Sequence, residues 1–478
     1  MTRARGRRRV LLVVTALALL AGSSVVAVGA ASRRAQAAAD PLIAGLRERA
    51  LASDVALQVV SSLTSEVGPR PAGSAADARA VSWAMATLQK LGFDNVHSEP
   101  VTVPHWVRGE ETGEIVAPWP QRMSLCALGG SGGTPEEGIT AEVASFPTLE
   151  ALQAAPAEQV QGKIVFLDRR MERTRDERGY GEAVVIRRDG AATAGKKGAL
   201  AVLIRSVGTG SHRFPHTGGT RYGDGPKVPA AALAGPDADL LARQLASGQP
   251  VRFHLRLTSR VLADEPSANV IAEVRGATHP DEIVLLGAHL DSWDLGTGAI
   301  DDGAGVAIVT AAAKLIAGQP RRPARTVRVV LFANEEFGLS GARAYATAHA
   351  DELPHHVLAI EADLGAAKTW AFRATASQTG VAFLRSLAPD LQPLGIVWED
   401  RPALGGADLS PLVPARVPFA DLFQDASEYF DIHHTADDTL DKIDPSSLAQ
   451  NVTAYALLAW RVADSDVELG PAPEPPPN

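Results

Sequence analysis

The chain has 478 residues, of which 46% are hydrophobic and 21% are charged. This is the composition of a globular protein, and the length predicts two or three domains. The net charge of -9 and the pI near 5.8 exclude a nucleic-acid-binding class, because such proteins need a basic surface to neutralise phosphates. Cys126 is the only cysteine, which excludes an intrachain disulfide and a thiolate metal site. Any bound metal ion would need His, Asp and Glu ligands.

The first 39 residues have the pattern of an export signal. A basic start, MTRARGRRR, precedes an uncharged apolar stretch and then the small residues of SRRAQAAAD. The apolar stretch has about 20 residues, which could just span a bilayer, so a membrane anchor is the alternative. We therefore expect a secreted or extracytoplasmic protein whose residues 1–39 are a signal peptide or, if they are not cleaved, a membrane anchor.

The next segments predict a first part of one domain followed by an insertion. Residues 40–114 show two helical patterns around the loop VGPRPAGS and then a strand-like stretch, VHSEPVTVPHWVRGE. From about residue 115 the sequence is rich in Gly and Pro, and short β-like runs such as GKIVFLD and GALAVLIRSV alternate with short helices. We expect residues 115–262 to form an inserted, β-rich domain.

Residues 263–466 read as a run of β and α units. The expected strands are 269–276, 282–290, 326–334, 356–365 and 418–423, and the expected helices are 303–318, 340–353 and 446–464. This alternation predicts a three-layer α/β/α sandwich around a mixed, mainly parallel sheet. Residues 467–478, which end in PAPEPPPN, are expected to be a disordered tail.

Imidazole and carboxylate side chains follow four of these predicted strands. In open α/β sheets the ligand site lies at the carboxyl ends of the strands. Each residue alone has an ordinary explanation, since an Asp can cap a helix and a single His is more often structural. Together they indicate one site at one edge of the sheet. They are His289, Asp291, Asp301, Asp302, Glu335, Glu336, Asp363, His433 and His434.

Such a cluster of carboxylates would repel itself unless cations neutralised it. Two divalent ions held by two His and three carboxylates would do so, and imidazole with carboxylate suits zinc. Zinc ions in pairs, roughly 3.5 to 4 Å apart, serve hydrolysis. Spacing alone does not decide which of Glu335 and Glu336 would be a general base, nor which of His433 and His434 would be a ligand.

Four stretches carry a resemblance to a known family: GAHLDSWDLGTGAIDDGAG, ANEEFGLSGA, EADLG and HHTADD. They resemble the motifs of the co-catalytic di-zinc exopeptidases, which include bacterial aminopeptidases. Within that family HLDSWD, LIRSV, PHTG and YFDIHHTADDTLDKID are most similar to a secreted dipeptidase. The resemblance covers roughly residues 45–465, and it implies that the insertion is a protease-associated (PA) domain.

The resemblance also implies a role for each site residue. Two zinc ions would be bound, one by His289 and Asp363 and the other by Glu336 and His434, with Asp301 bridging them. Glu335 would be the general base that takes a proton from the attacking water and later gives it to the leaving amine. Asp291 would orient His289. In GGADLSPL, Asp408 lies where the family places substrate-facing residues, although a plain loop acid explains it equally well.

The resulting hypothesis is a secreted, zinc-dependent exopeptidase that hydrolyses short peptides, above all dipeptides with a free amino terminus. One alternative is an aminopeptidase on longer peptides or an aminoacyl-amide hydrolase. A second is a non-catalytic binding ectodomain, which we disfavour because all five ligand positions and the base are filled. FGLSGA and GGSGG only approximate a serine-hydrolase elbow. The PA-like domain would be a substrate lid or the contact of a homodimer.

Overall fold

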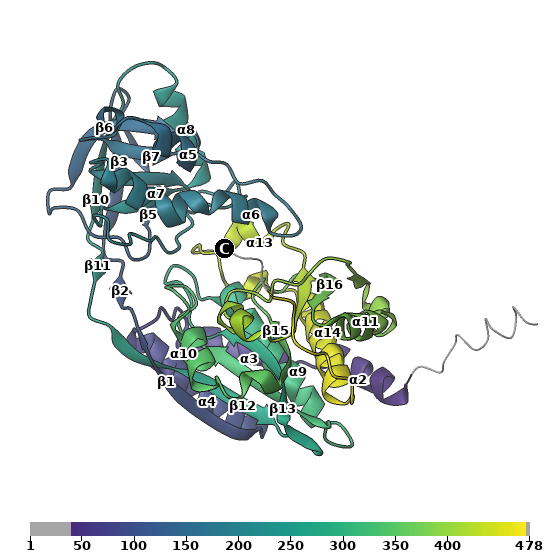
Figure 1. Ribbon diagram of the computed structural model, residues 1–478. Helices are drawn as coiled ribbons and strands as arrows, with labels where there is room; N and C mark the ends of the chain where they lie inside the picture. The colour runs from purple at the N-terminus through teal and green to yellow at the C-terminus, as the bar shows by residue number, and fades with distance from the viewer. Residues whose placement is uncertain (1–39, 475–478) are drawn as a thin grey trace, which may run out of the picture.

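The described residues form two eight-stranded sheets, which belong to two separate parts of the molecule (Figure 1). Each sheet packs against hydrophobic clusters of its own. The computed structural model describes residues 40–474, so the predicted signal or anchor at residues 1–39 lies outside the described residues. Within residues 40–474 no helix is both long enough and apolar enough to cross a bilayer.

The first sheet has the mixed, mainly parallel topology that the sequence predicts. Its strand order is β1-β12-β14-β13-β15-β18-β16-β17. The four central strands β14, β13, β15 and β18 run parallel, whereas β1, β12 and β16 pair antiparallel with their inner neighbours. The bounds are β1 Asp94–Val103, β12 Glu265–Val274, β13 His279–His289, β14 Arg325–Phe332, β15 His356–Glu361, β16 Thr369–Thr375, β17 Val397–Trp398 and β18 Phe419–Gln424.

Helices cover both faces of this sheet, which completes the predicted three-layer sandwich. Side chains alternate between the faces along each strand, so Val284 and Leu286 of β13 join one core and Ile283 and Leu285 the other. Strands that are buried on both sides need continuous apolar runs, which explains EIVLLGA and VRVVLFA. The first core contains α2 Pro41–Leu51, α3 Val55–Ser62, α4 Ala75–Leu91, α9 Ala304–Ala317 and α14 Pro445–Ala463, and the second contains α10 Ser340–Ala348.

The second sheet forms what we call the inserted domain, with strand order β4-β3-β10-β6-β7-β8-β9-β5. The paired strands β2 Trp106–Val107 and β11 Arg260–Val261 connect it to the main domain (Figure 1). The division predicted at residues 115 and 262 stays a prediction. The strands are β3 Glu111–Ala117, β4 Gln121–Met123, β5 Leu125–Ala127, β6 Ile139–Phe146, β7 Ile164–Leu167, β8 Ala201–Arg205, β9 Ala230–Leu233 and β10 Arg252–Leu257, and the helices are α5 Leu149–Ala154, α6 Arg178–Ala183, α7 Val185–Lys196 and α8 Gly235–Leu245.

Two parts of the main domain differ from the sequence analysis. Residues 369–400 contain β16, β17 and the helices α11 Gln378–Ser386 and α12 Ala388–Leu391, none of which were predicted. The expected disorder of the tail is not found for residues 467–474. Leu469 and Ala472 are buried there, and the Leu469 carbonyl accepts a hydrogen bond of 3.1 Å from the Ser377 N–H. Two apolar side chains with a place to pack keep this segment on the domain despite its prolines.

Candidate metal centre

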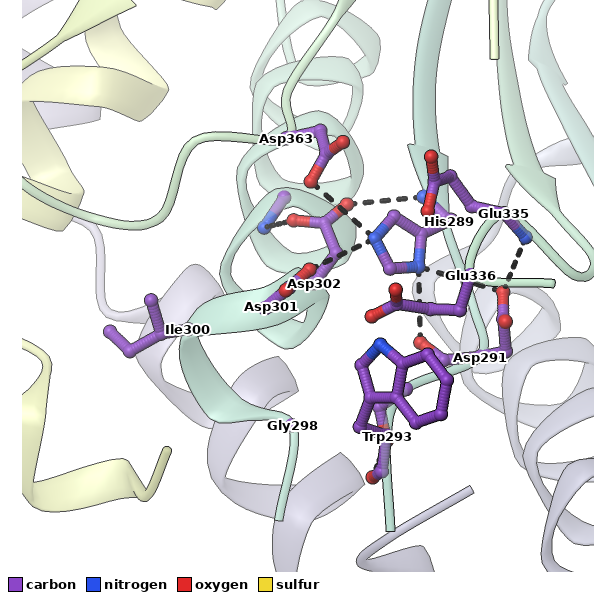
Figure 2. Close-up of polar contacts among 12 residues, drawn as sticks. His289, Asp291, Trp293, Gly298, Ile300, Asp301, Asp302, Glu335, Glu336 and Asp363 are labelled. Atoms are coloured by element: carbon purple, nitrogen blue, oxygen red, sulfur yellow. Dashed lines mark hydrogen bonds and ion pairs between the residues drawn. The ribbon is translucent and has the colours of Figure 1, made fainter. Parts of the chain in front are cut away.

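Two pairs of histidine and carboxylate side chains meet at Asp301, and Figure 2 shows the pair formed by His289 and Asp363. On one side His289, the last residue of β13, has its Nε2 3.1 Å from Asp301 Oδ1 and 3.4 Å from Asp363 Oδ1. On the other side His434 Nε2 lies 3.1 Å from Asp301 Oδ2 and 3.1 Å from Glu336 Oε2. The structure therefore brings together all five residues expected as ligands. Asp301 turns one carboxylate oxygen toward each pair.

The donor atoms of this cluster fit divalent cations. His289, Asp301 and Glu336 offer ligand atoms within 4.8 Å of one another. Asp301 Oδ2 and Glu336 Oε1 are buried and have no hydrogen-bond partner among the described residues. Buried carboxylate oxygens need a proton, a donor or a metal ion. Imidazole nitrogen together with carboxylate oxygen is a donor set that suits zinc.

The electrostatics of the cluster point the same way. Burial is the largest cause that raises the pKa of Glu335, and the charge of Glu336 adds to it. Burial likewise raises the pKa of Glu336 and of Asp363, with a further contribution from Asp301 in both cases. Ionising these acids side by side is therefore unfavourable in the bare protein. A divalent cation would remove that repulsion.

The two glutamates that follow β14 take different places. Glu336 Oε2 contacts His434 and Glu336 belongs to a group of potential metal ligands with His289 and Asp301, whereas Glu335 belongs to no such group among the described residues. Both residues line the adjoining cavity. The backbone N–H of Glu335 donates to Asp291 Oδ1 at 3.0 Å (Figure 2). Asp291 also lies against His289, whose Nδ1 is 3.1 Å from the Asp291 carbonyl oxygen and 3.5 Å from its carboxylate. Asp291 thus touches both one metal-ligand candidate and the chain of the candidate base.

The neighbouring histidines also differ. His433 Nε2 is 3.4 Å from Asp301 Oδ2, and its ring stacks on that of His434 at a centroid distance of 3.5 Å. His433 Nδ1 has no hydrogen-bond partner among the described residues, whereas His434 Nδ1 lies 3.3 Å from the carbonyl oxygen of Thr217. A metal-binding histidine usually has such an acceptor for its second nitrogen. The geometry therefore favours His434 over His433 as the ligand.

Asp302 has a structural task. Its carboxylate accepts the backbone N–H groups of His289 at 3.1 Å and Gly305 at 2.9 Å. Both oxygens therefore already have donors, one of them at the start of α9. Asp302 joins β13 to α9 beside Asp301, and the Asp301–Asp302 peptide bond is cis.

Two fully buried residues that the sequence analysis missed hold the loop that carries Asp301. The Asp438 carboxylate accepts the N–H groups of Ile300 at 2.6 Å and Asp301 at 3.2 Å. Burial, followed by the charge of Asp301, raises the pKa of Asp438 to about 7. The Arg70 guanidinium donates to the carbonyl oxygens of Leu290, Thr297 and Gly298. Asp438 belongs to HHTADD and could have been found there, but Arg70 lies in VGPRPAGS, where no local signal indicates a role.

The sequence left two equal interpretations of Asp408, a substrate-facing residue and a plain loop acid. Its side chain is 0% exposed and does not line the cavity beside the cluster. Instead Glu361, at the end of β15, lines that cavity and accepts the N–H groups of Asp408 at 3.2 Å and Leu409 at 3.1 Å. The turn that follows two glycines directs its backbone donors at Glu361, which leaves the Asp408 carboxylate inside the protein.

A cavity of about 810 Å³ lies over the cluster, between the two domains. Its size is that of a pocket for a small ligand. The main domain contributes the acidic floor, which includes Asp301, Glu335, Glu336, Glu361 and Asp363. The inserted domain contributes a wall with Tyr180, Arg187, Arg188 and Arg221.

An α/β sandwich that carries buried His and carboxylate pairs at the ends of its parallel strands is the scaffold of a metal-dependent hydrolase. Comparison with known proteins agrees. The model of peptidase family M28 matches residues 269–459, and the PA domain model matches residues 111–241.

Several similar proteins cover most of the chain. Carboxypeptidase Q from Mus musculus is 37% identical over 410 residues, which are 85% of each chain, and that from Homo sapiens is 37% identical over 408 residues. The crystal structure of a peptidase M28 precursor from Shewanella amazonensis SB2B is 49% identical, covers 91% of this chain and 98% of its own, and superposes with a TM-score of 0.89. A zinc aminopeptidase from Bacillus subtilis shares the fold, with a TM-score of 0.64 at 21% identity. The chain belongs to peptidase family M28 and is a metallo-exopeptidase similar to carboxypeptidase Q.

Proposed function

We propose that the protein is an exported exopeptidase that uses two zinc ions to hydrolyse short peptides, above all dipeptides with a free amino terminus. The observation that carries this proposal is the position of Asp301 between two His and carboxylate pairs, with one oxygen toward each. His289 and Asp363 would hold one ion, Glu336 and His434 the other, and Asp301 would bridge them. The bound ions would polarise the scissile carbonyl and lower the pKa of the attacking water.

Glu335 is the proposed general base. It lies next to a ligand but is not part of a ligand cluster, and it lines the cavity. Its backbone is held by Asp291, so its carboxylate is offered to the cavity from a fixed point. In that place it would take a proton from the attacking water and then deliver it to the leaving amine.

The charges of the cavity support a peptide with both termini free. Arg187, Arg188 and Arg221 line the cavity. Arg187 is buried and already contacts Thr217, His434 and Tyr180, whereas Arg188 and Arg221 form no ion pair with a carboxylate among residues 40–474. Arg188 and Arg221 are therefore available to bind the carboxylate of the leaving residue. Glu177 and Glu361 line the same cavity and are suited to an ammonium group. A cavity of about 810 Å³ also limits the length of a peptide that carries both groups.

The test is a substrate panel on the zinc-loaded enzyme, with and without a chelator. A free dipeptide is expected to be hydrolysed faster than the N-acetylated dipeptide, the C-amidated dipeptide or a pentapeptide. Activity that survives complete removal of metal, or faster hydrolysis of the N-acetylated substrate, would contradict the proposal. Faster hydrolysis of the pentapeptide would instead identify an aminopeptidase for longer chains.

A pair of variants tests the role of Glu335. Glu335→Gln is expected to lower kcat by about 100-fold to 10,000-fold, the usual contribution of a general base, while the zinc content stays the same. Glu158→Gln is the matched control, since Glu158 is exposed on the inserted domain and does not line the cavity. A Glu335→Gln enzyme as active as this control would exclude Glu335 as the base.

Export is tested separately. The basic start and apolar stretch of residues 1–39 support it. In the native host the mature protein should be found outside the cytoplasm, and sequencing of its N-terminus should show cleavage near SRRAQAAAD. A cytoplasmic protein with an intact N-terminus would contradict export.

A further inference from the structure

The inserted domain contacts the metal centre directly, through the PHTG segment at residues 215–218. We propose that Thr217 and His216 are positioning residues that hold His434 as a ligand, so that one of the two metal positions is complete only when the inserted domain is docked. This inference rests on the proposed function, because it takes His434 as a zinc ligand. The inserted domain would then support a metal ligand in addition to forming a wall of the cavity.

Thr217 and His434 are joined by reciprocal hydrogen bonds. The Thr217 N–H donates to the His434 carbonyl oxygen at 2.9 Å, and His434 Nδ1 is 3.3 Å from the Thr217 carbonyl oxygen. A histidine that binds a metal through Nε2 carries its proton on Nδ1, and this N–H needs an acceptor. Arg187 Nη1 lies equally close to Nδ1, at 3.3 Å, but a guanidinium has no acceptor. Arg187 Nη1 also donates to the Thr217 carbonyl at 3.4 Å. In the tautomer that leaves Nε2 free for a metal, the Thr217 carbonyl is the acceptor that the Nδ1–H faces.

His216 contacts the carbonyl of His433, the residue before His434. Its Nδ1 is 2.7 Å from the carbonyl oxygen of His433, and its backbone N–H donates to Ser206 Oγ at 2.8 Å. His434 has a φ of 61°, in the left-handed region that residues other than glycine seldom adopt. Hydrogen bonds to the carbonyls of both His433 and His434 keep the backbone there. The inserted domain thereby fixes the main chain of the ligand as well as its ring.

The PHTG segment is itself anchored on two sides. Thr217 Oγ1 donates to the carbonyl of Ala127 in β5 at 3.0 Å and accepts from Arg108 Nη2 at 3.0 Å. Arg108 also binds both carboxylate oxygens of Asp294, at 2.8 and 2.6 Å. Asp294 lies on the loop that follows β13 of the main domain. Arg108, next to β2, therefore connects the PHTG segment to the loop that follows β13.

The same side of the inserted domain contacts the residues before His433. Figure 1 shows α6 beside α13, which spans Tyr429–Ile432. Tyr180 stacks on Phe430 with a centroid distance of 4.7 Å, and Thr209 Oγ1 donates to Asp431 Oδ1 at 2.7 Å. The segment that leads to His434 is thus held by the inserted domain over several residues.

The two metal positions should depend on this docking to different degrees. His289 is held by Asp291, and Asp363 follows β15, so that position is built within the main domain. His434 is held by Thr217 from the inserted domain. A substitution in the PHTG segment should lower the zinc affinity of the position formed by Glu336 and His434. The zinc affinity of the position formed by His289 and Asp363 should stay nearly unaltered.

The experiment measures both zinc affinities by titrating the metal-free, full-length protein in competition with a chromophoric chelator. His216→Leu keeps the approximate volume but removes the donor to His433, and Thr217→Val removes the anchor to Ala127. His216→Asn keeps a donor close to the place of Nδ1. Glu336→Gln removes a proposed zinc ligand, so the zinc affinity that it lowers is the affinity of the position formed by Glu336 and His434. Thr148→Val is the matched control, because it removes a hydroxyl that caps α5 far from the main domain.

We expect His216→Leu and Thr217→Val to weaken the affinity marked by Glu336→Gln by about 10-fold to 100-fold, the usual effect of losing a partner that orients a ligand. The other affinity should stay nearly constant, His216→Asn should recover most of the loss, and saturating zinc should restore most of kcat. If His216→Leu and Thr217→Val both kept the two zinc affinities of the wild type, or lost affinity equally at both positions, this inference alone would be overturned. A wild-type protein that binds fewer than two zinc ions would overturn the proposed function and this inference with it.

Discussion

Arg70 gives the sharpest test of how the loop between β13 and Asp301 is held in place. Its guanidinium is fully buried and donates to the carbonyl oxygens of Leu290 at 2.6 Å, Thr297 at 2.9 Å and Gly298 at 2.9 Å. These three residues lie on both sides of the loop between β13 and Asp301. Arg70→Met keeps much of the buried volume but leaves the three carbonyls without this donor.

The magnitude follows from these hydrogen bonds. The Gly298 carbonyl also accepts the N–H of Gly303 at 3.0 Å, so the variant leaves two carbonyls, those of Leu290 and Thr297, without a partner among the described residues. A buried polar group without a partner costs about 1–3 kcal/mol, so two of them would cost roughly 2–6 kcal/mol. The variant regains part of this because methionine avoids the several kcal/mol needed to bury a charge. The expected net loss in the free energy of unfolding is about 3–5 kcal/mol, the range found when a buried charged network is broken. Zinc affinity should fall as well, since Asp301 lies at the end of the loosened loop.

The assay is urea unfolding of the metal-free protein, followed by fluorescence and circular dichroism. Arg79→Met is the matched control, because Arg79 is exposed on α4 and its hydrogen bond among residues 40–474 goes to the carbonyl of Ala75, within its own helix. That control should change the free energy of unfolding by less than about 0.5 kcal/mol. A loss below about 1 kcal/mol in Arg70→Met, or equal losses in the two variants, would refute the reasoning.

Three further predictions follow from the described contacts. Burial lowers the pKa of His356 to about 4, so the folded protein keeps this histidine neutral, whereas the unfolded chain takes up a proton below pH 6.5. The free energy of unfolding should therefore fall by about 1–2 kcal/mol toward pH 5. In His356→Gln, the free energy of unfolding should lack this part of the pH dependence. Arg188→Leu should raise KM for a free dipeptide by about 10-fold, the value of one charge-assisted hydrogen bond, and leave KM for the C-amidated dipeptide unchanged, as steady-state kinetics would show. Removal of zinc should lower Tm in calorimetry, because an ion at 100 times its Kd stabilises the folded state by about 2.7 kcal/mol; equal Tm values with and without chelator would contradict a bound metal.

Local sequence patterns were enough to predict the central strands of the main domain. The strands β12, β13, β14, β15 and β18 were all expected, because strands buried on both faces need uninterrupted apolar runs. Parallel strands that alternate with helices bring their carboxyl ends to one edge. This is why His289, Asp301 and Asp363 could be assigned to one site although they are spread along the chain.

Local patterns were not enough where a residue acts through distant backbone groups. Arg70 reaches carbonyls some 220 residues away, and Thr217 meets His434 from a different domain. The sequence left Asp408 open between a substrate-facing residue and a plain loop acid, and the fold turns its N–H toward Glu361 and buries its carboxylate. Leu469 was assigned to a disordered tail, but it is buried in the main domain.

The sequence by itself predicted the kind of site that this protein carries and the residue types in it. The single cysteine left His, Asp and Glu as metal ligands, and the periodicity of apolar residues placed those side chains at the ends of strands. Only the tertiary structure decided which side chains contact one another. It placed Glu336 Oε2 and Asp301 Oδ2 against His434, and it set the Thr217 carbonyl against His434 Nδ1. The physical reason is that periodicity records which face of an element is buried, whereas the role of a polar side chain depends on the donors and acceptors that folding brings within about 3 Å of it.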